Sequence, residues 1–292
     1  MQFERMFSIF RSVARKWMYV KHYEEQHMMK HSGSYLKFLS IALILCLGLV
    51  TCYTNPITGR KELSLVPIDQ EVQLGAQSFN EMKQQTPVST DANANASVQR
   101  VGQRIASSVS LPQAQWEFVV FQDNTVNAFC LPGGKVGVYS GILPITQNDG
   151  GLATVIGHEV GHAVARHGGE RMSEQLLLQL GGVGLATAMR NKPQQTQDLA
   201  LAAYGIGTTL GRTLPHSRKQ ELEADYMGLI YMARAGYDPQ EAVNFWQRFK
   251  AWGDKQGSRT PEFLSTHPLD SKRIRELQKH MSEAQREFHS RG

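Results

Sequence analysis

Cysteine is scarce in this sequence, with only three in 292 residues. That number is too small for a disulfide scaffold. The sequence also lacks the composition of a disordered protein, since 41% of its residues are hydrophobic and 20% are charged. Its length is sufficient for one large domain or two small ones with a substantial core.

The net charge is also small outside the N-terminal region of the chain. The formal net charge is +5, but residues 1–37 carry seven basic and three acidic side chains, and Phe38–Cys52 carry none. The remaining 240 residues have 24 basic and 23 acidic side chains. A nearly neutral body without a basic groove argues against nucleic-acid binding, so we expect no nucleic-acid partner.

A long apolar run is missing as well. The 15 uncharged residues Phe38–Cys52 fall short of the roughly 20 that a spanning helix needs. Their length, after Lys30 and Lys37, is typical of the hydrophobic region of a signal peptide. The end of the run, Leu49-Val50-Thr51-Cys52, resembles a bacterial lipobox, although Thr51 departs from the usual Gly, Ala or Ser. We therefore expect membrane attachment through a lipidated Cys52, with an uncleaved anchor or secretion as the alternatives.

The leader predicts a location in the cell envelope. The expected product faces the periplasm as an outer-membrane lipoprotein, or alternatively has an inner-membrane anchor or is secreted. A start at Met28 or Met29 would give a signal peptide of ordinary length, so the true start is left open. An organellar transit peptide over residues 1–20 is disfavoured by Glu4 and the later Glu24 and Glu25.

The body of the chain predicts a mostly helical α+β fold. The best strand candidates are Trp116–Phe121 and Lys135–Tyr139, and residues 86–95 are expected to form a loop. Apolar periodicity and composition predict helices over 69–83, 97–109, 149–166, 170–190, 195–210, 217–235, 239–252 and 269–288. We divide the chain into a leader (1–52), a tether or N-terminal arm (53–68), a catalytic domain (69–288) and a tail (289–292).

The stretch Leu180–Gly211 is rich in Gly, Ala and Leu and is interrupted by Asn191-Lys192-Pro193. This composition favours a buried helical hairpin. The alternative is a mobile lid over a site, because glycine hinges would permit such motion.

The chemistry centres on His158-Glu159-Val160-Gly161-His162. Positions i and i+4 of a helix share a face, so both imidazoles can hold one Zn²⁺. Glu159 is one residue further on, beside the metal rather than on it. Apolar residues on the other faces of this segment predict a buried helix.

A catalytic zinc needs a third protein ligand, and the best candidates are Glu221 and Asp225 in Glu221-Leu222-Glu223-Ala224-Asp225. They share a helix face, so one carboxylate can bind zinc while the other orients a ligand histidine. A solvated acidic helix start capped by Ser217 is the alternative interpretation.

Together with Thr266-His267-Pro268-Leu269 and Arg273-Ile274, these motifs resemble metallopeptidase family 48. The resemblance extends from Thr54 to about Leu277 and is closest to the soluble Oma-like and lipoprotein branch. It implies a gluzincin-type domain with a small sheet before the His158–His162 helix. It also implies one zinc ion per chain, with His158, His162 and Glu221 as ligands, Glu159 as general base and acid, and Asp225 as partner of a ligand.

Three further histidines are considered with this resemblance. His267 lies where relatives carry a histidine near the metal, and it could stabilise the oxyanion or close the fourth coordination position in a resting form. His216 is expected to be a surface residue, with an approach to the metal in a closed state as the alternative. His167 is expected to be structural.

The resulting functional prediction is a zinc metalloendopeptidase in envelope quality control, acting on unfolded or misassembled envelope proteins. Strand Lys135–Tyr139 is expected to bind an extended substrate by strand addition. The alternative is a latent or site-specific protease with chaperone-like client binding and little proteolysis. The oligomeric state is left open.

Overall fold

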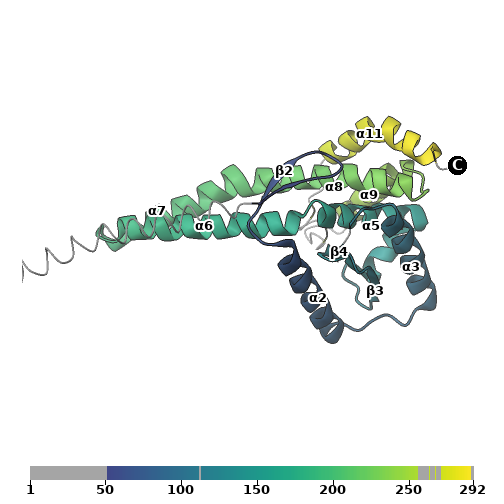
Figure 1. The fold of residues 1–292 in the computed structure, drawn as a ribbon, viewed down its shortest axis with the longest axis horizontal. Coiled ribbons are helices and arrows are strands. Elements are labelled where there is room, and N and C mark those ends of the chain that lie inside the picture. Colours follow the sequence, from purple (N-terminus) through teal and green to yellow (C-terminus); the bar gives the residue numbers. More distant parts are fainter. Residues whose placement is uncertain (1–50, 112, 256–262, 264–266, 268–270, 291–292) are drawn as a thin grey trace, which may run out of the picture. The chain divides into compact units, whose positions relative to one another are not determined.

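The structure is a computed structural model that describes residues 51–111, 113–255, 263, 267 and 271–290. The chain separates into two compact units, residues 1–51 and 52–292, and the following description concerns the second (Figure 1). The predictions for the leader, including lipidation of Cys52, lie outside the described residues, and so does the side chain of His216.

Helices make up most of the described chain, and the strands are short. In chain order the elements are β1 (Thr51–Thr54), β2 (Lys61–Ser64), α2 (Ile68–Gln85), α3 (Ala92–Ser107), β3 (Glu117–Phe121), β4 (Ala128–Leu131), β5 (Lys135–Tyr139), η1 (Ser140–Ile142), α4 (Leu143–Thr146), α5 (Asp149–Val164), α6 (His167–Met189), α7 (Gln194–Thr208), η2 (Thr209–Thr213), α8 (Leu214–Arg234), α9 (Gln240–Lys255) and α11 (Ser271–His289). The predicted α+β, mostly helical fold class is therefore confirmed.

The larger sheet has the order β3-β5-β4. Strand β5 runs parallel to β3 and antiparallel to β4, with Gly137 opposite Val119 on one side and Phe129 on the other. Both edges of β5 are therefore paired, and no backbone groups remain for a substrate. The prediction that Lys135–Tyr139 receives a substrate strand is wrong for this reason.

Two local predictions also need correction. Helix α3 begins at Ala92, within the expected loop 86–95, because the side chain of Asp91 accepts hydrogen bonds from the backbone N–H groups of Asn93 and Ala94 and caps the helix. Strand β4 was not expected, and it is the short edge strand of the sheet. Of residues 53–68, for which a tether and an N-terminal arm were both considered, 61–64 form β2, which pairs with β1 in a two-stranded sheet, and α2 begins at Ile68.

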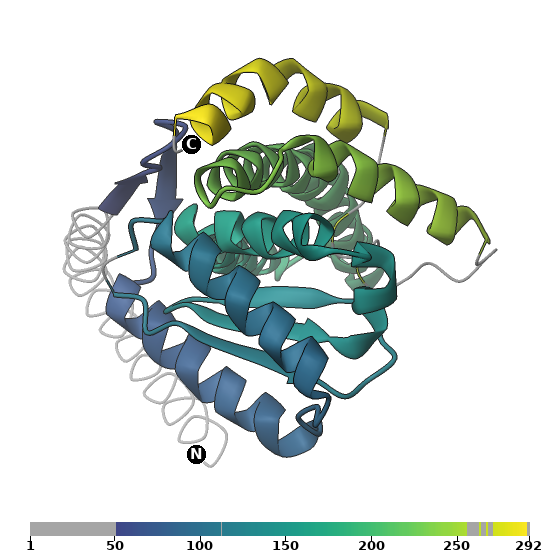
Figure 2. The same ribbon diagram turned by 90° about the vertical axis from the view of Figure 1, so that its right-hand side faces the viewer.

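Helix α5 is the centre of the core. It packs against β4 and α3 on one side and along α8 on another (Figure 2). The two long helices approach closely at glycines: a Cβ placed on Gly157 would lie 2.9 Å from the carbonyl oxygen of Gly228, and one on Gly228 would lie 2.7 Å from the backbone nitrogen of His158. This approach brings residues of α8 next to the histidines of α5.

Helices α6 and α7 form an antiparallel hairpin (Figure 1), in which the Tyr204 hydroxyl donates to the carbonyl of Leu178 at 2.9 Å. The hairpin was predicted to be buried, and this is wrong. Helix α7 has no buried residue, and α6 has none beyond Glu174. Large apolar side chains on both helices are more than half exposed, including Leu180, Val183, Leu199 and Ile206. No described helix is long and apolar enough to cross a membrane.

Candidate metal centre

Three elements position the side chains of the predicted site. Helix α5 carries His158, Glu159 and His162, all of them buried. The Asn148 side chain caps this helix by accepting a hydrogen bond from the backbone N–H of Gly151. Helix α8 carries Glu221 and Asp225, which are 2% and 4% exposed. His267 comes from the segment between α9 and α11 and is also buried.

Four donor atoms converge at one point. His158 Nε2 lies 3.2 Å from His162 Nε2 and 3.4 Å from Glu221 Oε2, and His162 Nε2 lies 3.3 Å from Glu221 Oε1. His267 Nδ1 lies 3.2 Å from His158 Nε2 and 3.1 Å from both Glu221 oxygens. Ligands about 2.0–2.1 Å from a tetrahedral zinc lie about 3.3 Å from one another. The donor set and its spacing therefore fit one zinc ion.

His158 is oriented by a buried carboxylate. Its Nδ1 lies 3.0 Å from Asp225 Oδ1, so this nitrogen donates its proton to Asp225 and Nε2 is the nitrogen directed at the other donors. Arg273 holds Asp225 in turn through two hydrogen bonds, from Nε at 2.6 Å and from Nη2 at 2.7 Å. The sequence pattern named Arg273 without giving it a role, and the structure shows that it fixes the carboxylate behind His158.

His162 has a comparable chain of partners, which the sequence did not indicate. Its Nδ1 lies 2.8 Å from Nδ1 of His167, whose Nε2 lies 3.2 Å from Glu223 Oε2. With the His167 proton on Nε2 and donated to Glu223, its Nδ1 accepts from His162. The lone pair of His162 Nε2 is then directed to the donor cluster. His167 is thus more than a packing residue.

The N-terminal arm holds the outer end of this chain. Arg60 Nε donates to Glu223 Oε2 at 2.6 Å, and Asn55 Nδ2 donates to Glu223 Oε1 at 2.8 Å. The hydroxyl of Thr58 donates to the same carboxylate. Arg60 also contacts Glu62 at 2.6 Å and Glu170 at 2.9 Å. The β1-β2 arm is therefore part of the support of the site.

Burial and neighbouring charges set the protonation states. Burial lowers the pKa of His162 well below its usual value, against the attraction of Glu221, and favours the neutral ring that binds metals. Burial disfavours the charged form of His158 too, but its bonds to Asp225 and Glu221 outweigh this and raise its pKa to about 9. The pKa of Glu221 is lowered because the surrounding histidines outweigh its burial.

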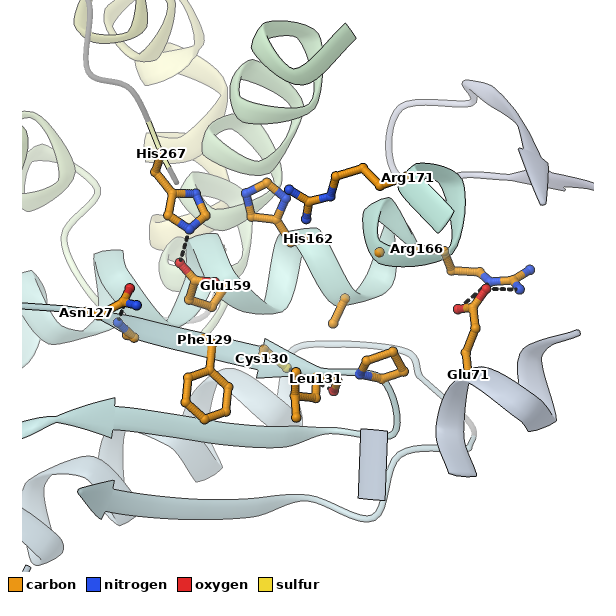
Figure 3. Close-up of a pocket in the computed structure, with 14 residues that line it drawn as sticks. Glu71, Asn127, Phe129, Cys130, Leu131, Glu159, His162, Arg166, Arg171 and His267 are labelled. Carbon is orange, nitrogen blue, oxygen red and sulfur yellow. Dashed lines mark hydrogen bonds and ion pairs between the residues drawn. The ribbon is translucent and has the colours of Figure 1, made fainter. Parts of the chain in front are cut away.

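Glu159 lies beside the donor cluster, not within it. Among the described residues its Oε1 is buried without a hydrogen-bond partner, and the ring of His267 lies nearby, with Nε2 at 3.5 Å (Figure 3). Burial raises the pKa of the Glu159 carboxyl, although His267 and His158 oppose the shift. A carboxylate with a raised pKa and an oxygen that accepts no hydrogen bond is suited to accept and return a proton near neutral pH.

A cavity of about 270 Å³ opens over Glu159, His162 and His267. Residues of β4 and the following Pro132 line its opposite wall, and β4 runs alongside α5 in Figure 3. Because β4 is an edge strand that pairs with β5 alone among the described strands, its other edge can accept an extended chain. No residue of the hairpin beyond Arg171 lines this cavity, so nothing in the described chain supports a lid there.

The sequence-predicted residues thus occupy one place. His158, His162, Glu221 and His267 supply the four donors, Glu159 borders them, and Asp225 lies behind His158. Sequence reasoning gave no role to Arg60, Glu223 and Arg273, which have a place in the site, and it gave His167 a structural role only. The position of Glu223 between Glu221 and Asp225 was a signal that could have identified it. Its partners could not be predicted, because Arg60 and Asn55 come from the distant N-terminal arm.

A buried helix with two metal-binding histidines and an adjoining glutamate, served by a carboxylate from a second helix, defines a metallopeptidase-type centre. Comparison with known families agrees. The model of peptidase family M48 matches residues 92–281, and the chain belongs to this family of zinc metallopeptidases. The predicted family and the zinc cofactor are confirmed. The predicted enzyme class, a zinc metalloendopeptidase, is confirmed with them.

Curated relatives include mitochondrial and bacterial proteins. The chain is 36% identical over 233 residues to the mitochondrial metalloendopeptidase OMA1 of Schizosaccharomyces pombe, covering 79% of this chain and 66% of the relative. It is 40% identical over 178 residues to OMA1 of Saccharomyces cerevisiae, covering 58% and 48%. It is 28% identical over 225 residues to the beta-barrel assembly-enhancing protease of Escherichia coli K12, covering 76% and 46%. The chain thus spans between about half and two thirds of these relatives.

Proposed function

We propose that this protein is a metalloendopeptidase that cleaves extended or unfolded segments of envelope proteins. The observation that carries the proposal is the convergence of four donor atoms next to Glu159, whose buried Oε1 accepts no hydrogen bond from the described residues, at the floor of a cleft bordered by an edge strand.

Within this proposal each residue has a distinct task. His158, His162 and Glu221 hold the zinc ion, which when bound supplies Lewis acidity toward water and the scissile carbonyl. Glu159 Oε1 takes a proton from the attacking water and returns it to the leaving amine. Asp225 fixes the ring of His158 so that Nε2 remains directed at the ion.

The free edge of β4, not β5, binds the substrate backbone in this proposal. Main-chain hydrogen bonds to a strand edge give affinity without strict sequence requirements. This tolerance suits unfolded or misassembled proteins as substrates. The beta-barrel assembly-enhancing proteases among the relatives support a quality-control role, and the mitochondrial metalloendopeptidases support the endopeptidase activity. We place the protein at the envelope, attached through Cys52 or the segment Phe38–Cys52.

A second candidate function is that of a latent protease that binds clients without cleaving them. One contact favours it: His267 Nδ1 occupies the fourth donor position, which a catalytic zinc keeps open for water or substrate. In this arrangement the segment carrying His267 must withdraw before cleavage. His267→Ala then increases proteolysis, whereas it decreases proteolysis if His267 serves the oxyanion.

The deciding experiment compares wild type with Glu159→Gln on an unfolded protein substrate, with zinc content measured for both. We expect the variant to retain zinc and lose activity by about 10²–10⁴-fold, the usual contribution of general acid–base catalysis. Equal cleavage by the two proteins would refute the assignment. A zinc-loaded wild type that cleaves only after His267→Ala is introduced would support the latent form.

A further inference from the structure

The outer part of the α6–α7 hairpin, residues 175–211, has the composition of a membrane-facing segment. We call it the outer hairpin. Its only charged side chains are Arg190, Lys192 and Asp198. Large apolar side chains project from both legs: Leu180 is 59% exposed, Val183 64%, Leu199 71% and Ile206 62%. A helix that is apolar on all sides normally has an apolar environment on all sides, and the described chain provides none here.

Glycine adds an independent observation. The outer hairpin contains six glycines, and a Cβ added to Gly184, Gly205, Gly207 or Gly211 would meet nothing within 4 Å. Close packing inside the chain therefore does not require them. In water, each glycine in a helix costs stability relative to alanine. Glycine is more frequent in helices that contact lipid than in soluble ones.

The charges favour a lipid surface over another protein as the occupant. Arg190 and Lys192 lie at the turn between the legs, and no acidic residue occurs between Gln175 and Gln197. A cationic tip on an otherwise uncharged hairpin is complementary to anionic headgroups. The 15 residues of α6 beyond Glu174 extend about 22 Å, which is less than the roughly 30 Å hydrocarbon core. The hairpin therefore fits a position within the interface and does not span the bilayer.

Chain order places the hairpin close to the expected attachment point. The apolar segment Phe38–Cys52 ends in β1, and β1 pairs with β2. After β2, the backbone N–H of Leu65 donates to Ser173 Oγ on α6 at 2.9 Å, just before the outer hairpin begins. An anchor that ends at Cys52 is thus connected through one small sheet to the base of the hairpin.

We propose that the outer hairpin docks into the interfacial region of a bilayer that contains anionic lipids, as a second membrane contact besides the N-terminal segment. This contact is independent of the peptidase chemistry. It holds the α5–α8 cleft at the membrane surface, where segments of incompletely assembled membrane proteins are accessible.

The test uses the full chain with Cys46, Cys52 and Cys130 replaced by serine and reconstituted into vesicles. An environment-sensitive fluorophore is attached to Val183→Cys, to Ile206→Cys, or to the matched control Leu74→Cys, whose residue is 43% exposed on α2. Vesicles consist of phosphatidylcholine alone or with one quarter phosphatidylglycerol, with and without spin-labelled lipids as quenchers. We expect blue-shifted emission and several-fold greater lipid quenching at 183 and 206 than at 74, increased by phosphatidylglycerol.

Further variants separate the possible occupants. Leu180→Asp with Val183→Asp should abolish quenching at 206, and Arg190→Glu with Lys192→Glu should abolish the increase from phosphatidylglycerol. Emission at 183 and 206 as water-exposed as at 74 would overturn the proposal. Protection without quenching by lipid would also overturn it, and would assign the surface to a second copy or to another segment of this chain.

Discussion

The α5–α8 region and the α6–α7 hairpin reverse the usual distribution of polarity. The first buries ionisable groups, with His158 1% and Glu221 2% exposed, while the second leaves Leu199 71% exposed to solvent. Buried charges require partners, and exposed apolar helices require cover. In each region the composition is explained by a component other than the polypeptide: zinc in the first and, as we propose, lipid in the second.

Removing zinc should affect the two regions very differently. The donors of His158, His162 and Glu221 converge at one point, so bound metal stabilises this region by mass action. The effect amounts to about 4 kcal/mol when free zinc is a thousand times its Kd. We expect a chelator to lower the Tm and to accelerate amide hydrogen exchange in α5 and α8. Exchange in residues 175–211 is the internal control, and acceleration confined to those residues would contradict the assignment of the metal centre.

Replacement of glycine by alanine should have opposite effects on stability in the two regions. At Gly228 an added Cβ would lie 2.7 Å from the backbone of His158, so Gly228→Ala should separate α8 from α5 and cost about 1–3 kcal/mol. At Gly205 an added Cβ meets nothing within 4 Å, so Gly205→Ala should stabilise its helix by about 0.5–1 kcal/mol. Thermal unfolding with hydrogen exchange measures both. A loss of stability in both variants would show that the hairpin is packed in water.

The sequence was informative about the first region because its signal is local. The spacing of His158 and His162 is decided by helix geometry, and so is the shared face of Glu221 and Asp225. The relay through His167 was not predictable, because it requires Glu223 of α8 and Arg60 of the arm to meet. Such contacts depend on how distant elements pack, and a single sequence contains no pattern for that.

The sequence was misleading about the second region for a physical reason. Apolar composition in Leu180–Gly211 predicts removal from water, but it does not specify whether protein or lipid provides the apolar surroundings. Strand β4 was missed for another reason: its four residues are too few for a clear alternation, and pairing with β5 defines it. The choice of β5 as the substrate strand failed because strand order is not encoded locally.

The supports of the two ligand histidines can be compared by a matched pair of variants. Asp225→Asn weakens the acceptor behind His158, and His167→Ala removes the acceptor behind His162. Each should reduce zinc affinity by about 10- to 100-fold, measured by competition with a chromogenic chelator, and should change the absorption spectrum of the cobalt-substituted protein. Thr146→Ala is the control, since Thr146 is buried in α4 without contact to this relay. An unchanged spectrum in His167→Ala would show that His167 contributes only packing and does not orient His162.

The last prediction concerns the protonation of Glu62, where the arm meets the buried region. Burial, with Glu170 and Glu223 nearby and Arg60 opposing, raises the pKa of Glu62 to about 8. The folded state therefore retains a proton that the unfolded chain releases above about pH 4.5, so this group makes stability fall as pH rises from about 4.5 to 8. Glu62→Gln removes that loss, and we expect a gain of about 1–2 kcal/mol over wild type near pH 8.5 and little gain near pH 5. Unfolding at the two pH values measures the difference, with exposed Glu81→Gln as control. A variant that is less stable than wild type at the higher pH would mean that the contact with Arg60, at 2.6 Å, keeps Glu62 ionised, and that the arm is bound to the buried region by charge.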